Sequence, residues 1–373
     1  MSVIVATSTK LPENYYPQEV LAAALKKYLL VKELDFDLSI IDRFFTNVKI
    51  DGRYFTIPLD DFFEPPGLEK TVNSCIKITV SLLEEAINNL LTKVNLKPQE
   101  ISQLTSVSIY QPSPALGGLL MNQIPFAPTL KRLPLGGLGC IGGTIGLSRV
   151  ADYLKGHPTE AVILTTSELN SGLWQGSLQA DLSNLLTQLP TDQSVYSDII
   201  MTIVTAALFG DGAAATLMVG REHPLAQPGL PMVVDTRSIL LPQTVQLMGL
   251  DLVSTGFRNI LRPQVSDHVK VGLHQAIYPL LQQHNLSLED ISRWIVHPGG
   301  PKILEAIEEE FNLKPDVLQM SHEILAEVGN ISSSTVIYIL NKLLDREPPP
   351  SGSYGLIVAM GPGFSQEAIL IQW

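Results

Sequence analysis

The chain has 373 residues, of which 45% are hydrophobic and 17% charged, and its net charge is −12. This length allows two domain-sized cores or one large two-part domain, and the apolar content is too high for a disordered chain. The acidic balance argues against non-specific binding of nucleic acid, which requires a basic face.

Two cysteines, Cys75 and Cys140, occur in the whole sequence. One optional pair provides no disulfide framework and fits a reducing compartment. The N-terminal segment lacks the basic and then apolar pattern of a signal peptide, and no uncharged apolar run approaches the roughly 18–20 residues needed to span a bilayer. We therefore predict a cytoplasmic protein without a membrane span.

Short β-rich apolar runs alternate with longer runs of helical periodicity, for example over residues 82–91 and 303–311. This alternation predicts an α/β protein in which helices cover the sheets. The Pro-rich segment His223–Pro231 is the predicted boundary between two halves, residues 1–225 and 226–373. Residue identity reveals no internal repeat. The predicted buried strands are Val3–Ala6, Ser106–Tyr110, Ala161–Thr166, Ala213–Val219, Trp294–Val296, Gly355–Met360 and Ala368–Ile371.

Cys140 lies between glycines in Leu138–Thr144 and precedes a helical pattern. Glycines let the backbone turn tightly and let a substrate approach the sulfur. The N-terminal end of a helix favours the thiolate, which is the nucleophilic form of cysteine. The alternative is a small buried cysteine behind a glycine turn. A purely structural role is the interpretation we favour for Cys75, which lies inside a helical apolar run.

His297 follows a predicted buried strand and precedes a helix, a place where α/β folds position reactive side chains. Asn330 precedes another helical run, where Asn is a good N-cap; alternatively, its amide points into a site. Together, a thiolate, an imidazole and an amide suit acyl transfer from a thioester. They supply one nucleophile and two donors for a developing oxyanion.

Five sequence blocks in this order resemble the signature blocks of type III polyketide synthases, the chalcone and stilbene synthase family with its bacterial alkylresorcinol and alkylpyrone relatives. The resemblance extends from about Ile4 to the C-terminus. It implies a thiolase-like fold, in which two similar halves stack as five α-β-α-β-α layers, and a homodimer. The blocks are Gly139–Gly143, Ala207–Ala215, His297–Leu304, Gly329–Ser333 and Gly361–Gly363.

The resemblance also implies a reaction. Cys140 would accept a starter acyl group from coenzyme A or an acyl-carrier protein, while His297 and Asn330 hold the thioester oxygen of malonyl-CoA during decarboxylation. The resulting enolate would attack the acyl-cysteine, and repeated extension and cyclisation would give an alkylresorcinol- or alkylpyrone-type product. Coenzyme A thioesters are substrates, and no metal or redox cofactor is expected. The alternatives are a ketoacyl-ACP synthase III-like enzyme that performs one condensation, and an inactive scaffold that partners an active synthase.

Cavity residues are likewise implied by the resemblance. Phe209 matches a gatekeeper between the coenzyme A tunnel and the reaction cavity, and Asn259 falls near the position of a second gatekeeper. Asn170 and Leu173 fall where the family varies side chains that set starter size and chain length.

A phosphate-binding role follows from the same resemblance for a second set of residues. Arg53 matches an arginine that meets the phosphates of coenzyme A. Basic neighbours are lacking beside it, and Lys302, just past Gly300 and Pro301, is the residue expected to compensate.

The segment Gln179–Ile200 makes the step from Cys140 to Phe209 longer than the family spacing. Its leucines recur at helical spacing, the pattern breaks at Pro190, and polar residues lie between the leucines, so the segment is predicted to be amphipathic. We predict that it shields or extends the acyl-binding end, for a long aliphatic starter or for the protein that delivers it. A surface loop or a dimer contact is the alternative.

Overall fold

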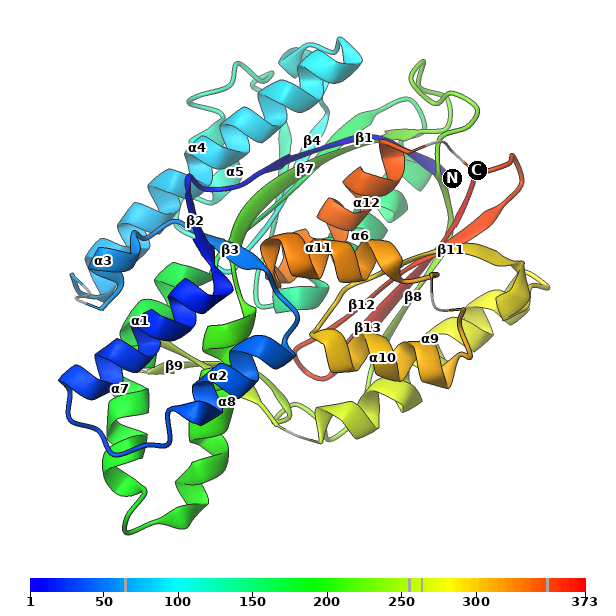
Figure 1. The fold of residues 1–373 in the computed structure, drawn as a ribbon. Coiled ribbons are helices and arrows are strands. Elements are labelled where there is room, and N and C mark those ends of the chain that lie inside the picture. The colour runs from blue at the N-terminus through cyan, green and yellow to red at the C-terminus, as the bar shows by residue number, and fades with distance from the viewer. Residues whose placement is uncertain (64–65, 254–255, 263, 315, 347–348) are drawn as a thin grey trace.

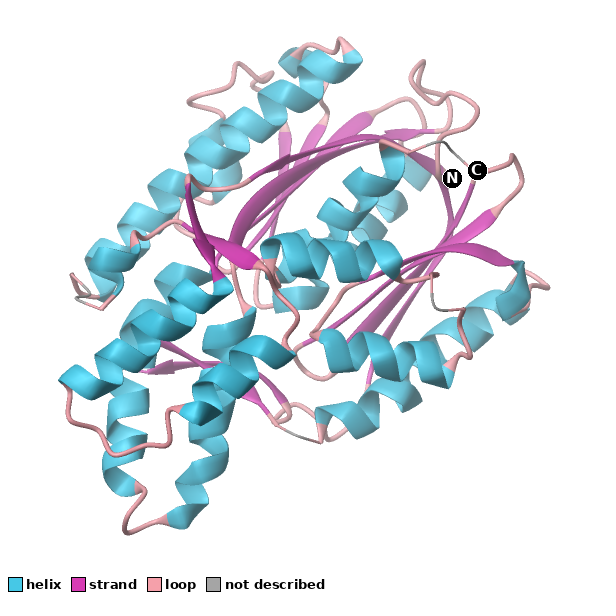
Figure 2. Ribbon diagram, in the orientation of Figure 1, coloured by secondary structure: helices cyan, strands magenta, loops and turns pink. Residues whose placement is uncertain are grey.

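The computed structural model describes residues 1–63, 66–253, 256–262, 264–314, 316–346 and 349–373. Within these ranges, nine strands form one mixed sheet in the order β11-β12-β13-β8-β1-β7-β6-β4-β5, and helices lie on both faces of it (Figures 1 and 2). The strands are β1 (Ser2–Lys10), β4 (Gln103–Ser108), β5 (Lys131–Leu135), β6 (Ala161–Leu169), β7 (Asp211–Gly220), β8 (Met232–Leu240), β11 (Ile291–Val296), β12 (Tyr354–Gly361) and β13 (Ser365–Gln372).

The sheet consists of two parts with the same topology. In the first part, β4 and β6 are parallel, and β7 and then β1 follow as antiparallel strands. In the second part, β11 and β12 are parallel, and β13 and then β8 follow as antiparallel strands. The parts are joined where β1 pairs with β8, at Ser2 with Val233 and Val3 with Met232. This order of strands is a duplication that residue identity does not reveal.

Helices form three layers around the two parts of the sheet. Helix α6 (Gly142–Gly156) contacts strands of both parts, as does α12 (Thr335–Leu344), so these two helices form the central layer. Helix α4 (Leu68–Val94) covers the outer face of β1, β6 and β7, and α9 (Val265–Gln283) covers the outer face of β8 and β13. Figure 1 shows the resulting α-β-α-β-α stack. Every residue from Thr335 to Leu340 is buried, as expected for a helix packed on all sides.

The remaining described elements lie around this stack. The helices are α1 (Gln18–Val31), α2 (Ser39–Asn47), α3 (Leu59–Phe62), α5 (Leu116–Leu120), α7 (Asn170–Gln188), α8 (Tyr196–Leu208), α10 (Pro301–Glu310) and α11 (Gln319–Val328). Two ribbons are formed by β2 (Asn14–Pro17) with β3 (Gly52–Phe55), and by β9 (Met248–Val253) with β10 (Gly256–Leu261). No helix in the described ranges combines the length and the apolar composition that a bilayer-spanning segment requires.

Six of the seven predicted strands lie inside observed strands, and the seventh is displaced. Ser106–Tyr110 overlaps β4 only as far as Ser108, because β4 begins with the buried polar residues Gln103 and Thr105, which an apolar pattern does not identify. The same limitation hides β8, whose centre carries the polar run 235–238.

Residues 179–200 contribute to a helical hairpin made of α7 and α8, which projects from the sheet beside α1 and α2 (Figure 1). Helix α7 ends at Gln188, two residues before Pro190, so the predicted helix and its break are confirmed. Leu182 and Leu186 are buried, while Asn184 and Gln188 are exposed. The amphipathic pattern is therefore confirmed for these residues.

Candidate active site

Cys140 lies on the short 3₁₀ helix η2 (Gly139–Ile141), directly before α6, which confirms its predicted place at a helix N-terminus. Gly139 has φ 54°, a left-handed conformation that glycine adopts without steric cost. At Gly143 an added Cβ would lie 2.1 Å from the carbonyl oxygen of Ser333. Glycine there lets α6 pack directly against η5 (Ser332–Ser334), which is the element that follows Asn330.

The Cys140 side chain is 5% exposed and has polar neighbours. Burial raises the pKa of its thiol to about 12, a hydrogen bond with Ser332 lowers it, the nearby Glu168 raises it, and a hydrogen bond with Asn330 lowers it. Burial therefore outweighs the effect of the helix N-terminus, on which the sequence-based expectation of a thiolate relied. A stable thiolate requires a cation beside the sulfur.

Asn330 does not cap α12, because that helix begins at Thr335 after Ser334. Its side-chain Oδ1 instead accepts a hydrogen bond from the Ser332 N–H at 2.8 Å. Its backbone bonds to both sides of Phe209: its N–H donates to the Leu208 carbonyl at 3.0 Å, and its carbonyl accepts from the Gly210 N–H at 3.0 Å. The N-cap interpretation was wrong, and the amide is held beside Cys140.

His297 leaves the carboxyl end of β11, and its backbone N–H donates to the Val358 carbonyl of β12 at 2.9 Å. Strand β12 pairs with β11 and also contacts η2, so β12 links the strand before His297 to the short helix that carries Cys140. The imidazole is 1% exposed, and burial lowers its pKa to about 3. Among the described residues neither ring nitrogen has a hydrogen-bond partner. Buried polar atoms are rarely left unpaired, so both nitrogens are available to a bound molecule or to the thiol.

A hollow with about 390 Å³ of empty space, part of it open to solvent, lies over the Cys140 sulfur. Its walls include three of the predicted cavity residues, Asn170, Phe209 and Asn259. The Asn170 amide donates to the Gly210 carbonyl at 2.6 Å, and the Asn259 amide donates to the Thr205 hydroxyl at 3.1 Å. Both asparagine side chains are thus hydrogen-bonded to the segment around Phe209, from Thr205 to Gly210.

The remaining predicted residues lie elsewhere. Leu173 is on α7, and its side chain lies outside the described part of the structure. Gly300 and Pro301 begin α10, and Lys302 is exposed on its first turn. As far as the described residues show, none of these three lines the hollow over Cys140.

Arg53 requires a correction, because it is 1% exposed rather than facing solvent. Its Nε donates to Gln18 Oε1 at 3.1 Å, and its Nη1 donates to the Phe209 carbonyl at 2.7 Å. The guanidinium therefore supports the backbone of Phe209 from inside the protein. The expectation that it meets the phosphates of coenzyme A does not fit this burial.

Two residues of the site were not predicted. Ser332 lines the hollow, hydrogen-bonds Cys140, and has φ 49°, an uncommon conformation for a residue other than glycine. Glu168 lies near the end of β6, which is buried throughout, and accepts hydrogen bonds from the Ser333 hydroxyl at 2.5 Å and the Ile109 N–H at 3.1 Å. Burial raises the pKa of Glu168 to about 7. The only sequence signal for Ser332 was its place in the block after Asn330.

A thiol, an imidazole and an amide are thus carried by neighbouring elements within a thiolase-like stack. Of the three, Cys140 lines the hollow, whereas His297 and Asn330 are not among its lining residues. This combination is that of an enzyme that transfers acyl groups through a cysteine. No group of three or more His, Cys, Asp or Glu side chains is placed to hold a metal ion, in the ranges that the structure describes.

Comparison with known proteins agrees with this class. Residues 232–373 match the family model of chalcone and stilbene synthases, C-terminal domain, and residues 56–188 match that of FAE1/type III polyketide synthase-like proteins. The chain is 33% identical to 1,3,6,8-tetrahydroxynaphthalene synthase of Streptomyces peucetius subsp. caesius, over 99% of this chain and 93% of that protein. It is 31% identical to a putative chalcone synthase of Bacillus subtilis, over 100% of this chain and 99% of that protein.

Among solved structures, 1,3,6,8-tetrahydroxynaphthalene synthase of Streptomyces coelicolor A3(2) superposes with a TM-score of 0.85 at 25% identity, covering 100% of this chain and 99% of that chain. The chain therefore belongs to the type III polyketide synthases of the chalcone and stilbene synthase family. It is an acyltransferase that performs a decarboxylating condensation. The comparisons support this family rather than the ketoacyl-ACP synthase III-like alternative.

Proposed function

We propose that Cys140 carries the growing acyl chain and that His297 and Asn330 stabilise the oxyanions of the reaction. The Cys140 sulfur attacks the starter thioester carbonyl, the thiolate of coenzyme A leaves, and an acyl-cysteine forms. Malonyl-CoA then loses CO₂, and the enolate oxygen accepts hydrogen bonds from His297 and from the Asn330 amide. The enolate carbon attacks the acyl-cysteine, which yields an extended β-ketoacyl-CoA and releases the Cys140 thiolate.

The observation that carries this proposal is buried His297, whose two ring nitrogens have no hydrogen-bond partner within the described ranges, after a strand whose neighbour β12 contacts the short helix of Cys140. A structural histidine at 1% exposure normally has a hydrogen-bond partner. The Asn330 side chain lies beside the Cys140 sulfur, and in this proposal it and His297 are the two donors to the reacting carbonyl. These side chains supply the chemistry, so the proposal requires no metal or redox cofactor.

The proposed product is an alkylresorcinol or alkylpyrone made from an aliphatic starter, delivered by coenzyme A or an acyl-carrier protein, and malonyl-CoA. Support comes from a second hollow, with about 590 Å³ of empty space, between the α7–α8 hairpin and β10. Leu185 and Met201 line it on the hairpin side together with Asp198 and Thr202, and the opposite wall combines Ile260 and Leu261 with the charged residues Asp251, Arg258 and Arg262. Asn259 lines both this hollow and the one over Cys140, so the two lie on either side of one side chain.

Mass spectrometry of the products tests this proposal directly. Incubation of the protein with decanoyl-CoA and malonyl-CoA is expected to give cyclised products that carry the decanoyl chain and more than one acetate unit. A second candidate product is 1,3,6,8-tetrahydroxynaphthalene, the compound that the Streptomyces peucetius relative is named for. Formation of that compound from malonyl-CoA alone, with decanoyl-CoA left unused, would contradict the aliphatic starter and support the second candidate.

Filling the hairpin hollow is expected to change starter selection. In Met201→Trp, the larger side chain occupies space between α8 and β10, so the ratio of kcat/KM for decanoyl-CoA to that for acetyl-CoA falls on the order of tenfold. Tyr196→Trp at the exposed start of α8 is the matched control and leaves the ratio unchanged. An unchanged ratio in Met201→Trp would instead assign the hairpin to a surface or dimer contact.

We also propose a homodimer located in the cytoplasm. Strand β5 is an edge strand of the nine-stranded sheet with four exposed residues, among them Leu133, and such an edge is normally covered. Light scattering on the purified protein checks the dimer, and a monomeric mass would contradict it.

The proposed location rests on the cysteines. Both are unpaired, as expected in a reducing compartment.

A further inference from the structure

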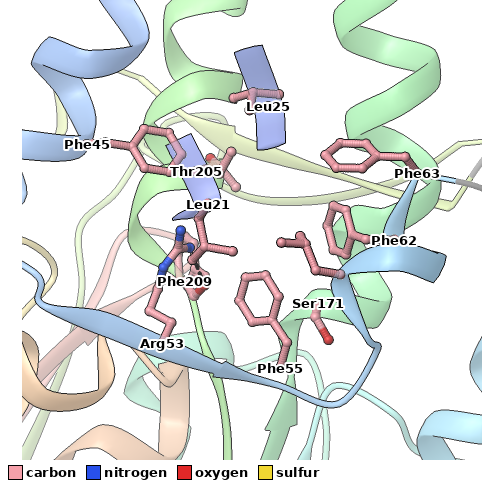
Figure 3. Close-up of a pocket in the computed structure, with 12 residues that line it drawn as sticks. Leu21, Leu25, Phe45, Arg53, Phe55, Phe62, Phe63, Ser171, Thr205 and Phe209 are labelled. Atoms are coloured by element: carbon pink, nitrogen blue, oxygen red, sulfur yellow. Dashed lines mark hydrogen bonds between the residues drawn. The ribbon is translucent and has the colours of Figure 1, made fainter. Parts of the chain in front are cut away.

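Phe209 borders a third hollow, which does not include Cys140 (Figure 3). This hollow has about 450 Å³ of empty space, part of it open to solvent, and lies among α1, α2, β3, α3 and α8. Figure 3 shows aromatic rings and leucines directed into it from several elements. Its apolar walls are formed mainly by Leu21, Leu25, Phe45, Phe55, Phe62 and Phe63.

Arg53 is the charged residue that lines this largely apolar hollow, whose wall also includes the hydroxyl residues Ser171 and Thr205. Its guanidinium lies over the rings of Phe45 at 5.8 Å and Phe55 at 5.3 Å. Two of its nitrogens donate within the protein, whereas Nη2 is buried and has no hydrogen-bond partner among the described residues. In Figure 3 the guanidinium lies at the wall of the hollow, near Leu21 and Phe209.

The charge of Arg53 also lacks an ion pair within the described ranges. Asp211 favours the charged guanidinium from a distance. Its carboxylate, however, accepts its hydrogen bonds from the Thr56 N–H at 2.6 Å and from the N–H and hydroxyl of Ser171 at 2.8 and 2.5 Å. A buried charge is costly unless an opposite charge and hydrogen bonds compensate it. The third nitrogen of Arg53 is therefore left without a compensating acceptor in a side chain that borders the hollow.

We propose that this hollow is a second ligand site, which binds a monocarboxylic acid with an apolar body. The carboxylate accepts a hydrogen bond from Arg53 Nη2, and the hydrocarbon lies against the phenylalanines and leucines. A carboxylate matches the planar donors of a guanidinium, and the apolar walls disfavour a heavily hydrated anion such as inorganic phosphate. The ligand would contact Phe209 from the side opposite to the Cys140 hollow, in whose wall Phe209 also lies.

Titration calorimetry of the whole protein with octanoate, octanol and octylamine tests the two parts of this site. The three probes share one hydrocarbon chain and differ in the head group. Octanoate is expected to bind at least about tenfold more tightly than octanol, because only octanoate brings a negative charge to the guanidinium. Octylamine is expected not to bind, because its cation faces Arg53. Equal binding of octanoate and octanol would overturn the assignment of the head group to Arg53.

Variants then locate the binding. Phe63→Ala removes a half-buried ring from the wall and is expected to lower the affinity for octanoate at least about fivefold. Leu59→Ala is expected to lower the affinity by a similar factor, and it provides the test if Phe63→Ala does not fold. Phe44→Ala, on α2 but outside the wall, is the matched control and keeps wild-type affinity. Cys140→Ala also keeps it. If Phe63→Ala and Leu59→Ala leave the affinity for octanoate unchanged while octanoate prevents alkylation of Cys140, octanoate binds in the catalytic hollow. The proposal would then be wrong.

Discussion

Replacing Cys140 with alanine is expected to abolish the acyl-enzyme and to lower product formation by at least about four orders of magnitude. Cys140 is the nucleophile proposed for the hollow, and alanine offers no atom that can form a thioester. His297 and Asn330 remain in the variant, so slow decarboxylation of malonyl-CoA continues. Intact-protein mass spectrometry after incubation with a starter thioester measures the acylation, and release of CO₂ measures the decarboxylation.

The chain offers a matched control in its other cysteine. Cys75 is fully buried on α4, and burial raises the pKa of its thiol to about 12, as it does for Cys140. Cys75 does not line the hollow over Cys140, so Cys75→Ala removes an equally buried thiol from another part of the fold. That variant is expected to become acylated normally. Acylation of Cys140→Ala, or its loss in Cys75→Ala alone, would contradict the role given to Cys140.

The predicted site residues that lie on neighbouring elements are those that a short motif in the surrounding sequence identified. Cys140 lies between glycines before a helix, and His297 follows a buried strand, so short motifs place both at the ends of elements. Asn330 was ambiguous, because an N-cap and a site residue share one pattern. Only the geometry of η5 and the start of α12 at Thr335 distinguish them.

Arg53 shows why other residues could not be predicted. Its partners are Gln18 on α1 and the carbonyl of Phe209, 156 positions away in the sequence. Whether an arginine faces solvent or the interior depends on such long-range packing, which a motif around Arg53 does not contain. The hollow that it borders arises in the same way, from α1, α2, β3, α3 and α8 together.

The fold was predictable where the apolar runs were continuous and not where polar residues are buried. Strands β7 and β12 were identified because their centres are almost entirely apolar, with Thr216 of β7 the exception. The duplication of the sheet escaped detection, since it is preserved in the order and direction of strands rather than in side chains. The five layers were implied by resemblance to the family, whereas periodicity alone indicated only helices over sheets.

Replacing His297 with glutamine is expected to suppress the reactivity of the Cys140 thiol near neutral pH. Burial raises the pKa of Cys140 to about 12 and lowers the pKa of His297 to about 3, so each group alone is neutral at pH 7. A proton that moves from the sulfur to the imidazole creates two opposite charges at once, and their attraction offsets both desolvation costs. Glutamine keeps a hydrogen-bond donor at this position but cannot accept the proton.

The pH dependence of iodoacetamide alkylation, followed on the Cys140 peptide by mass spectrometry, measures this effect. A thiol reacts as its thiolate, so the rate rises as pH approaches the thiol pKa and levels off above it. In the wild type, the imidazolium lowers that pKa, and the rate levels off at the lower pH. In His297→Gln, burial, Ser332, Glu168, Asn330 and the backbone of Cys140 itself still act on the sulfur.

The variant is therefore expected to react about a thousandfold more slowly at pH 7, which corresponds to a pKa about three units higher. Its rate should still be rising at pH 9. His268→Gln, at a half-buried position on α9, controls for loss of a histidine and keeps the wild-type curve. Coincident curves for the wild type and His297→Gln would show that His297 does not activate the thiol, and would leave it only the role of an oxyanion donor during decarboxylation.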